Sequence, residues 1–233
     1  MDFNKHKYFM LQILRDIYSD LELANSLGFK GGTALMFFYK LPRFSVDLDF
    51  NLLNADKKKE NEIYQKLRDI LLQYGKIDDE ALKFFGPIVV LNYGSGERKL
   101  KVEISNRQYD NHYEVKAFMG LNMLVMSISD MFAHKLCALL GRTQLTNRDI
   151  FDCWFFMENR TPINKNLVES RMKMPFLDYL QKCIEQLDAL SDKGLMNGMG
   201  DLVNDAMKSF IRTKLRTKTI TLLKIYQKFP LIA

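Results

Sequence analysis

One stretch of twenty residues, GGTALMFFYKLPRFSVDLDF at positions 31–50, constrains the fold and the chemistry of this chain more than any other. In its second half, Asp47 and Asp49 flank a single leucine, and the alternation of residue types predicts a strand over 45–53. Residues two apart in a strand point to the same face, so the two carboxylates lie side by side. Burying like charges without compensation is costly. A hard divalent cation such as Mg²⁺, which prefers oxygen ligands, is the expected compensation.

The first half of the same stretch predicts a short helix behind a pair of glycines. Thr33 is a candidate N-cap for a helix that runs to about Tyr39, and Pro42 breaks it. Gly31 and Gly32 lie at the start of this helix, where backbone N–H groups let a phosphate approach closely. A phosphate-binding helix start followed by a metal-binding strand is an arrangement suited to a bound nucleotide.

A later strand offers a third carboxylate. Residues 81–93 and 98–105 are predicted to form two strands around a Gly-Ser-Gly turn. Glu103 lies on the polar face of the second strand and is the candidate that would complete the metal cage. The alternative is that Glu103 faces solvent and pairs with Lys99 or Lys101, and the sequence leaves both possibilities open.

Two polar residues directly precede the aspartates. Arg43 and Ser45 have the chemistry to contact a substrate phosphate or to brace the carboxylates. The alternatives are that Arg43 is a surface cation and Ser45 a turn residue.

The remaining chain is predicted to be mostly helical, with a few extended segments. Helices are expected over 3–26 (ended by Gly28), 56–75, 130–140 (capped by Ser129), 148–158 (capped by Asn147) and most of 164–229. Further extended segments are expected over 113–119 and 121–127. This order predicts an α+β fold with a mixed sheet and flanking helices over 1–127, followed by a helical C-terminal region over 128–233.

Composition excludes several classes of protein. The three cysteines and three histidines are scattered without a CxxC or HExxH motif, so a zinc site or a disulfide framework is not expected. No apolar run is long enough to span a membrane, and a cytoplasmic location is the default expectation. The formal net charge of +6, from 34 basic and 28 acidic residues, fits either a polyanionic partner or simple solubility.

A second cluster of charged residues lies in SDMFAHKLCALLGRTQLTNRDIFD at 129–152. Lys135 and Arg142 are seven residues apart and share a helical face if the helix extends that far. Arg148 and Asp152 are spaced to pair on the next helix. That pairing is also consistent with a purely structural ion pair beside an apolar face.

These motifs together resemble the AbiEii/AbiGii nucleotidyltransferase toxin family of type IV toxin–antitoxin systems, which act in abortive infection. The resemblance rests on Gly-Gly-Thr-Ala-Leu, on Leu-Pro-Arg-Phe-Ser-x-Asp-Leu-Asp-Phe and on the later R-D-x-x-D. It covers roughly 28–53 and 127–157 and implies the minimal nucleotidyltransferase fold. It also implies that the nucleoside triphosphate (NTP) and Mg²⁺ or Mn²⁺ bind at Gly31, Gly32, Thr33, Asp47 and Asp49.

The resemblance assigns roles in the second cluster as well. Lys135 would contact the triphosphate, and Arg142 and Arg148 would help to neutralise it. Asp149 or Asp152 would be a further essential acid, either as a base or as a positioning group. The helical region 128–233 would thereby complete the active site.

The activity implied is transfer of a nucleoside monophosphate from an NTP to RNA, with the 3′ end of tRNA as the expected acceptor. A cognate antitoxin encoded nearby would counter it. The alternatives are transfer to a small molecule or a protein hydroxyl, and a catalytically silent binding module of the same fold. One departure is Met36, where family members often carry an arginine.

Overall fold

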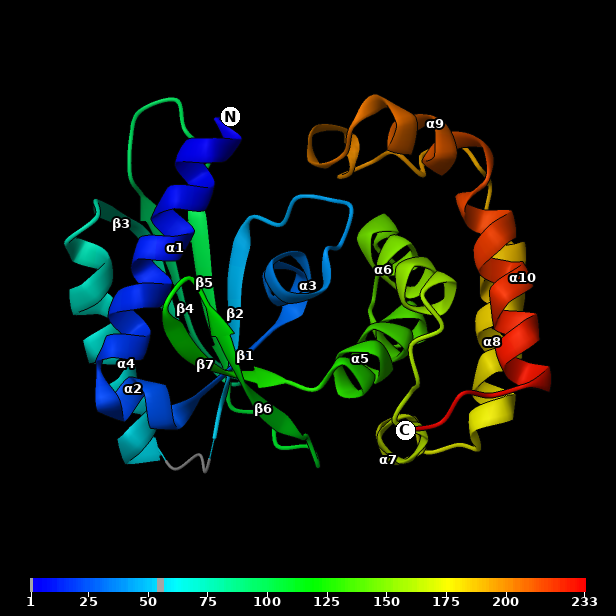
Figure 1. The fold of residues 1–233 in the computed structure, drawn as a ribbon, viewed down its shortest axis with the longest axis horizontal. Coiled ribbons are helices and arrows are strands. Elements are labelled where there is room, and N and C mark those ends of the chain that lie inside the picture. The colour runs from blue at the N-terminus through cyan, green and yellow to red at the C-terminus, as the bar shows by residue number, and fades with distance from the viewer. Residues whose placement is uncertain (1, 54–56) are drawn as a thin grey trace. The chain divides into compact units, whose positions relative to one another are not determined.

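The computed structural model describes residues 2–53 and 57–233 (Figure 1). Its contacts divide the chain into two compact units. The first unit comprises the chain up to Lys40, Ser45–Gln108 and Tyr113–Met126, and the second comprises Leu41–Phe44, Tyr109–His112 and Ser127–Ala233. The first unit contains the sheet, and the second is built from helices.

The described part of the first unit has a seven-stranded mixed sheet, which confirms the predicted fold class. Its strands are β1 (Leu27–Lys30), β2 (Asp47–Leu52), β3 (Lys76–Lys83), β4 (Gly86–Asn92), β5 (Leu100–Ser105), β6 (Tyr113–Phe118) and β7 (Leu121–Met126). The spatial order is β3-β4-β5-β2-β1-β7-β6. The β2–β5 and β1–β7 pairs are parallel, and the other neighbours are antiparallel.

Helices cover both faces of this sheet. They are α1 (Phe3–Ser19), α2 (Leu21–Ser26), α3 (Gly31–Tyr39) and α4 (Lys57–Leu72). Figure 1 shows α1, α2 and α4 on one face and α3 on the other. The apolar core lies under α1, where the Phe50 ring packs against Phe29 and Tyr18. The polar face of β2 therefore looks towards α3.

The predicted helix over 3–26 is two helices, because Asp20 interrupts it. The Asp20 carboxylate accepts hydrogen bonds from the backbone N–H groups of Glu22 and Leu23 and so caps α2. The prediction that Gly28 ends a helix is wrong, because Gly28 lies within the four-residue strand β1. A Cβ at Gly28 would lie 2.2 Å from the Tyr113 ring, so the close ring, and not a helix end, requires glycine here.

The strand predictions are partly correct. The segment 81–93 is not one strand but contains the end of β3 and all of β4, which meet at a tight turn. The edge strand β3 is mostly exposed and charged, so its sequence lacks the alternation that marks a half-buried strand. The segments expected over 113–119 and 121–127 are confirmed as the hairpin β6–β7.

The helix predicted over 56–75 is α4. Its predicted start at Asp56 lies outside the described residues.

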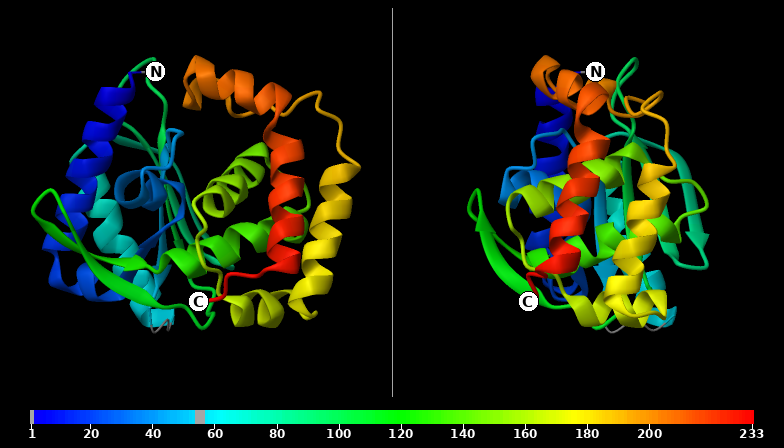
Figure 2. Two further views of the ribbon diagram at one scale, coloured as in Figure 1. Left: turned by 45° about the vertical axis from the view of Figure 1, so that its right-hand side comes forward. Right: turned by 90° about the vertical axis from the view of Figure 1, so that its right-hand side faces the viewer.

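The second unit consists of packed helices around an aromatic core. They are α5 (Ile128–Gly141), α6 (Asn147–Glu158), α7 (Lys165–Met172), α8 (Phe176–Asp188), the 3-10 turn η1 (Gly200–Leu202), α9 (Asp205–Thr213) and α10 (Leu215–Lys228). Phe132 of α5 stacks on Phe156 of α6 at 4.9 Å and meets Tyr226 of α10 edge-on. Helix α10 packs against α6 and α8, and Figure 2 shows α8 and α10 side by side.

The helical prediction for this region is confirmed, but both predicted caps are displaced. The N-cap of α5 is Ser127, not Ser129, and its hydroxyl accepts the N–H of Asp130 at 3.2 Å. Helix α6 begins at Asn147 itself, so the cap is the preceding Thr146. None of the helices in the described residues has the length and apolar composition needed to cross a membrane.

Candidate active site

The aspartate pair lies on one face of β2, as the strand period requires. Asp47 and Asp49 are half-buried, whereas Leu48 and Phe50 are buried on the opposite face. Among the described residues, no donor forms a hydrogen bond or an ion pair with either carboxylate. Two neighbouring carboxylates without partners are an unfavourable arrangement unless a cation joins them.

Helix α3 begins directly against these aspartates. Gly31, its first residue, has a φ of 80°, and a Cβ there would lie 2.5 Å from Asp49 Oδ2. Only glycine satisfies both the left-handed backbone and the close carboxylate. Thr33 does not cap the helix as predicted: Lys30 is the N-cap residue, and the Thr33 hydroxyl instead donates to the carbonyl of Asp47. This bond ties the first turn of α3 to the start of β2.

The neighbouring strands place charged groups in register with the aspartates. Asp49 pairs in register with Lys30 on β1 and with Glu103 on β5, and Asp47 with Lys101 on β5. The prediction that Glu103 lies beside the aspartate strand is therefore correct. The Glu103 carboxylate pairs with the Lys101 ammonium at 2.9 Å. This lysine pair is the arrangement that the sequence left open as the alternative to a metal ligand.

Burial and charge act in opposite directions on these groups. Burial raises the pKa of Asp49, and Asp47 and Glu103 raise it further, while Lys101 and Lys30 oppose the shift without cancelling it. Burial also works against ionisation of Glu103, but Lys101 lowers the pKa of that carboxyl below its usual range. Asp49 is thus the carboxylate whose charge is least compensated in the protein alone.

This donor set fits a hard divalent cation. Asp47 and Asp49 present oxygen ligands on one half-buried face of β2, and the glycine at the start of α3 lets the Asp49 carboxylate lie directly against the helix. Within residues 2–53 and 57–233, no group of three or more His, Cys, Asp or Glu side chains is already arranged around a metal position. Glu103 would have to leave Lys101 before it became a third ligand.

The uncompensated charge of Asp49 predicts a gain of stability when it is removed. The raised pKa means that the folded chain holds this proton more tightly than the unfolded chain, so ionisation above the unfolded pKa lowers stability. Asp49→Asn should therefore raise the Tm at neutral pH in EDTA by about 2–4 °C, equivalent to about 1 kcal/mol at this chain length. Asp79→Asn, at an exposed position of the same unit, should leave the Tm unchanged. A lower Tm for Asp49→Asn would contradict the assignment.

The second unit holds a buried ion network centred on Asp152. The Asp152 carboxylate is fully buried and accepts two hydrogen bonds from Arg43, from Nε at 2.6 Å and from Nη2 at 2.7 Å. The Lys135 ammonium lies 2.7 Å from the same carboxylate. Arg43 is therefore not a surface cation, because its side chain is 2% exposed. Arg43 braces the carboxylate of Asp152, and not that of Asp47 or Asp49 as the sequence suggested.

Lys135 joins Asp152 to a second buried carboxylate. Its ammonium lies 2.9 Å from Asp149 Oδ1, while Asp149 Oδ2 pairs with Arg142 at 2.8 Å and accepts the Thr146 hydroxyl at 2.7 Å. Both Lys135 and Arg142 reach this one carboxylate, although α5 ends at Gly141 and Arg142 has an extended backbone, so the helix does not extend as far as their predicted shared face required. Three cations meet two carboxylates, so the network carries an excess of one positive charge.

The pKa values in this network follow from its pairing. Burial alone would raise the pKa of Asp152, but Arg43 and Lys135 lower it below its usual range. Lys135 and Arg142 do the same for the pKa of Asp149. Burial would lower the pKa of Lys135, and Asp152 and Asp149 raise it instead. All three groups are therefore charged at neutral pH.

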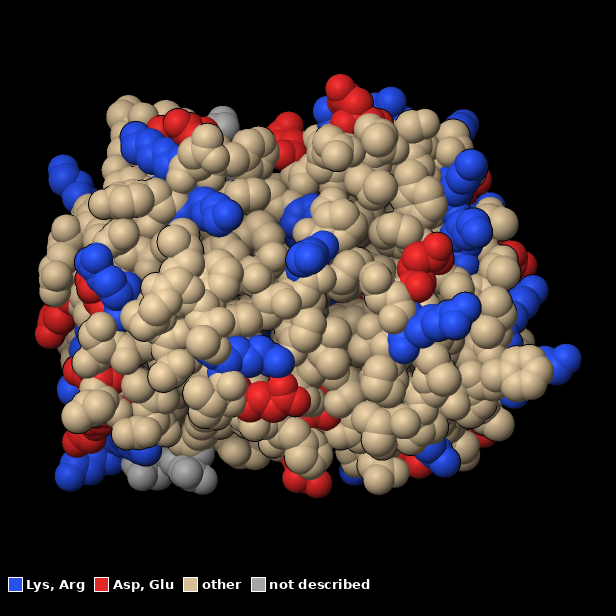
Figure 3. Space-filling view, in the orientation of Figure 1, with Lys and Arg blue, Asp and Glu red and all other residues tan. Residues whose placement is uncertain are grey.

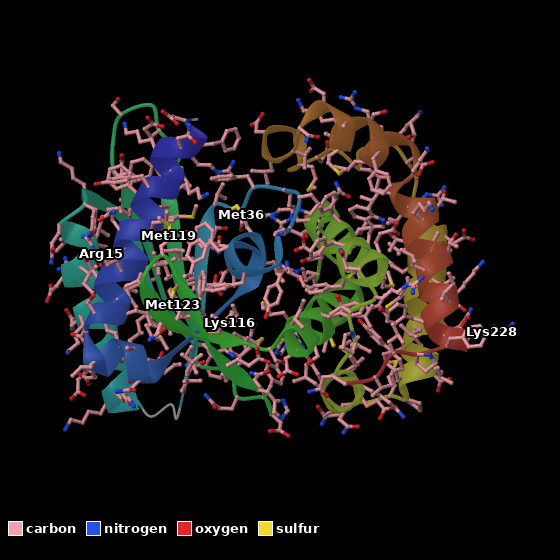
Figure 4. All side chains as sticks on the ribbon, viewed as in Figure 1. Arg15, Met36, Lys116, Met119, Met123 and Lys228 are labelled. Atoms are coloured by element: carbon pink, nitrogen blue, oxygen red, sulfur yellow. The ribbon has the colours of Figure 1, made fainter. Side chains whose placement is uncertain are left out.

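Not every predicted residue joins these two clusters. The proposed pair of Arg148 with Asp152 is not formed, because Arg43 and Lys135 occupy that carboxylate. Gly32 and Ser45 are buried. Met36, labelled in Figure 4, is half-buried on α3 at the position where the family often has arginine.

Sequence reasoning missed two participants, Lys30 and Thr146, and named Lys101 only as an alternative partner of Glu103. Lys101 lies two residues before Glu103 and therefore shares its strand face. The signal for Lys30 was absent, because strand β1 was not recognised.

The mixed sheet, the aspartate pair on β2 and the glycine-led helix start beside it form the arrangement of a nucleotidyltransferase. Residues 12–217 match the family described as Nucleotidyl transferase AbiEii toxin, Type IV TA system. Because this match covers most of the chain, the chain belongs to that family of toxins. Membership implies an NTP substrate and an antitoxin partner. The family predicted from the motifs is confirmed.

Solved structures with the same fold include proteins from two bacteria. JHP933 from Helicobacter pylori is 20% identical, with a TM-score of 0.62 over 98% of this chain and 93% of its own. A putative nucleotidyltransferase from H. pylori is 23% identical, with a TM-score of 0.58 over 97% and 95%. MenT4, a nucleotidyltransferase toxin from Mycobacterium tuberculosis, is 18% identical, with a TM-score of 0.66 over 99% and 88%. A search of curated proteins gave no match.

Proposed function

We propose that this toxin transfers a nucleoside monophosphate from an NTP to a hydroxyl of an RNA, with the 3′ end of tRNA as the acceptor. The observation that carries the proposal is the unpartnered carboxylate of Asp49 against the glycine start of α3. An unpartnered carboxylate favours a cation, and the N-terminal end of a helix favours a phosphate. Mg²⁺ or Mn²⁺ held by Asp47 and Asp49 would supply charge neutralisation for the triphosphate.

The residues around this position act mainly by orientation. Gly31 and Gly32 let the first N–H groups of α3 approach the phosphates, and Thr33 fixes that turn to β2. The acceptor hydroxyl forms a bond to the α-phosphorus as the bond to the pyrophosphate breaks, and the hydroxyl proton is released to solvent. Such a reaction depends on alignment and charge stabilisation more than on covalent help from the protein.

We propose that the ion network of the second unit serves the same reaction. Arg43 in this network is four residues from Asp47 in the sequence. Lys135 uses two of its three N–H donors for Asp152 and Asp149, and 18% of its side chain is exposed, so one donor remains for a phosphate oxygen. The terminal nitrogens of Arg142, a half-exposed side chain, can do the same.

The same geometry favours a positioning role for Asp149 and Asp152. Both are almost completely buried, and each accepts at least two charged or polar donors. A general base works best with a pKa near the operating pH, whereas these two pKa values are lowered. We therefore propose that they hold Lys135, Arg43 and Arg142 in place. Arg148, half-buried on α6, would add to the neutralisation of the triphosphate.

The test is nucleotide labelling. Wild type and Asp49→Ala should each be incubated with total RNA, Mg²⁺ and one of the four α-³²P-labelled NTPs. We expect labelled RNA, resolved on a denaturing gel, with wild type only. Label found in protein or in small molecules would move the acceptor to the alternative classes. No transfer to any acceptor with any NTP would contradict the proposal.

A further inference from the structure

The net charge of the protein is concentrated at its C-terminal end. Residues 205–233 contain one acidic residue, Asp205, and seven basic residues: Lys208, Arg212, Lys214, Arg216, Lys218, Lys224 and Lys228. Their balance of +6 equals the net charge of the whole chain, so residues 1–204 are neutral overall. Helix α10 itself contains no acidic residue.

Four of these cations form one exposed surface, here called the α10 basic face. Its members are Lys214, Lys218, Lys224 and Lys228, all exposed and, within the described residues, none in an ion pair. At about 100° per residue they fall within an arc of about 120° and span about 21 Å along the axis. The buried side of α10 points the other way. Figure 3 shows blue side chains along the edge where Figure 1 places α10, and Figure 4 labels Lys228 there.

Helix stability does not explain this arrangement. Lys214 and Lys218 lie at the N-terminal end of α10, where cations oppose the helix dipole. Each of the pairs Lys214–Lys218 and Lys224–Lys228 has the i,i+4 spacing, at which like charges repel. Arg216, on another side of the helix, is neutralised by Asp192 at 2.6 Å. Lys228, in the last turn, suits the dipole, but the N-terminal lysines and the two like-charge pairs of the α10 basic face cost stability, and an anionic partner would compensate for that cost.

Apolar groups within the same surface indicate the kind of anion. Ile225 lies inside the lysine arc with 47% of its surface exposed, and Phe229 follows the last lysine with 65% exposed. An exposed aromatic ring among lysines suits stacking with an unpaired base next to phosphate contacts. Lysine is depleted at protein–protein interfaces but is a main source of contacts to nucleic-acid phosphates. These features favour RNA over an acidic protein.

We propose that the α10 basic face binds the phosphate backbone of the RNA acceptor. The proposal rests on the proposed function, because it assumes that the acceptor is RNA. Each lysine would pair with a backbone phosphate and release its counterions, so affinity would depend strongly on salt. Phe229 would offer a stacking surface at one end.

The test is RNA binding without NTP, so that it does not depend on catalysis. A fluorescent, unstructured single-stranded RNA is titrated with protein across a NaCl series, and anisotropy gives Kd at each concentration. The test variant carries Lys214→Gln, Lys218→Gln, Lys224→Gln and Lys228→Gln. We expect Kd to rise at least about tenfold at low salt, and the slope of log Kd against log salt to fall by about 3, the loss of four contacts.

A matched variant controls for net charge. It carries Lys76→Gln, Lys83→Gln, Lys182→Gln and Lys193→Gln, four exposed lysines elsewhere on the chain, and is expected to keep the wild-type slope. Both variants should keep the rise in Tm with NTP and Mg²⁺, which reports a folded nucleotide site. An unchanged Kd and slope in the α10 variant, or no RNA binding by wild type, would overturn the proposal. Failed transfer with intact α10-dependent binding would instead overturn the proposed function.

Discussion

Asp49→Asn is expected to reduce nucleotide transfer by at least about a thousandfold while the protein stays folded. The change keeps the size of the side chain but removes the charge of the carboxylate beside the start of α3. Losing metal-assisted charge stabilisation costs several kcal/mol of barrier, and each 1.4 kcal/mol is about tenfold in rate. The rate of labelled product formation under single-turnover conditions measures this loss.

The matched control is Asp79→Asn, which removes an exposed carboxylate from β3 of the same unit. Its rate should equal that of wild type. Asp49→Asn should also lose the Mg²⁺-dependent part of the Tm shift caused by NTP, although its Tm without ligand should rise. Wild-type transfer by Asp49→Asn would remove Asp49 from the metal site.

Asp152→Ala is expected to destabilise the protein by about 3–5 kcal/mol. The substitution leaves Arg43, whose side chain is 2% exposed, without its bidentate partner and deprives Lys135 of one of its two carboxylates. Breaking a buried ion pair from one side leaves an uncompensated charge, which accounts for a cost of this size. Urea unfolding followed by circular dichroism measures it, and the Tm should fall by about 10 °C.

Asp188→Ala is the control, because Asp188 is exposed on α8 of the same unit. A surface substitution of this kind should change stability by less than about 0.5 kcal/mol. If Asp152→Ala were equally mild, the buried network would not hold the second unit together, and a positioning role for Asp152 would be untenable.

The same network predicts how stability depends on pH. Asp149 and Asp152 have pKa values lowered on folding, so their contribution is present above the unfolded value of about 4 and is lost as pH falls through the folded values. Lys135 has a raised pKa, so its contribution is present at neutral pH and is lost only as pH rises through its folded value. Asp152→Ala should therefore flatten the acid side of the profile.

Local sequence predicted the parts of the fold that depend on neighbouring residues. The strand that carries Asp47 and Asp49 follows from alternation, and the helix that ends before Pro42 follows from a breaker residue. The two extended segments over 113–119 and 121–127 were also predicted, but not their pairing as a hairpin. Strand β1 was missed, because four residues carry too little periodicity and Gly28 resembled a helix stop. The reason for that glycine is the Tyr113 ring, a contact that sequence spacing does not reveal.

Pairing between distant residues could not be predicted in this way. Arg43 and Asp152 are 109 residues apart, whereas the possible local partner with the correct helical spacing, Arg148, does not pair with this carboxylate. Glu103 was correctly placed beside the aspartate strand, but its bond to Lys101 depends on which of two neighbouring lysines lies closer. Charge type and strand face were evident in the sequence, and the choice of partner was not.

The sequence by itself determined that two carboxylates share one strand face behind a glycine-led helix, because strand and helix periods are local properties of the backbone. It also determined the family of the chain through those same motifs. Only the tertiary structure decided which charges are compensated. Asp152 is neutralised by Arg43, which is distant in the sequence, and by Lys135, which also pairs with Asp149. Asp49, by contrast, is left with a raised pKa beside Gly31, because electrostatic compensation depends on distance in space.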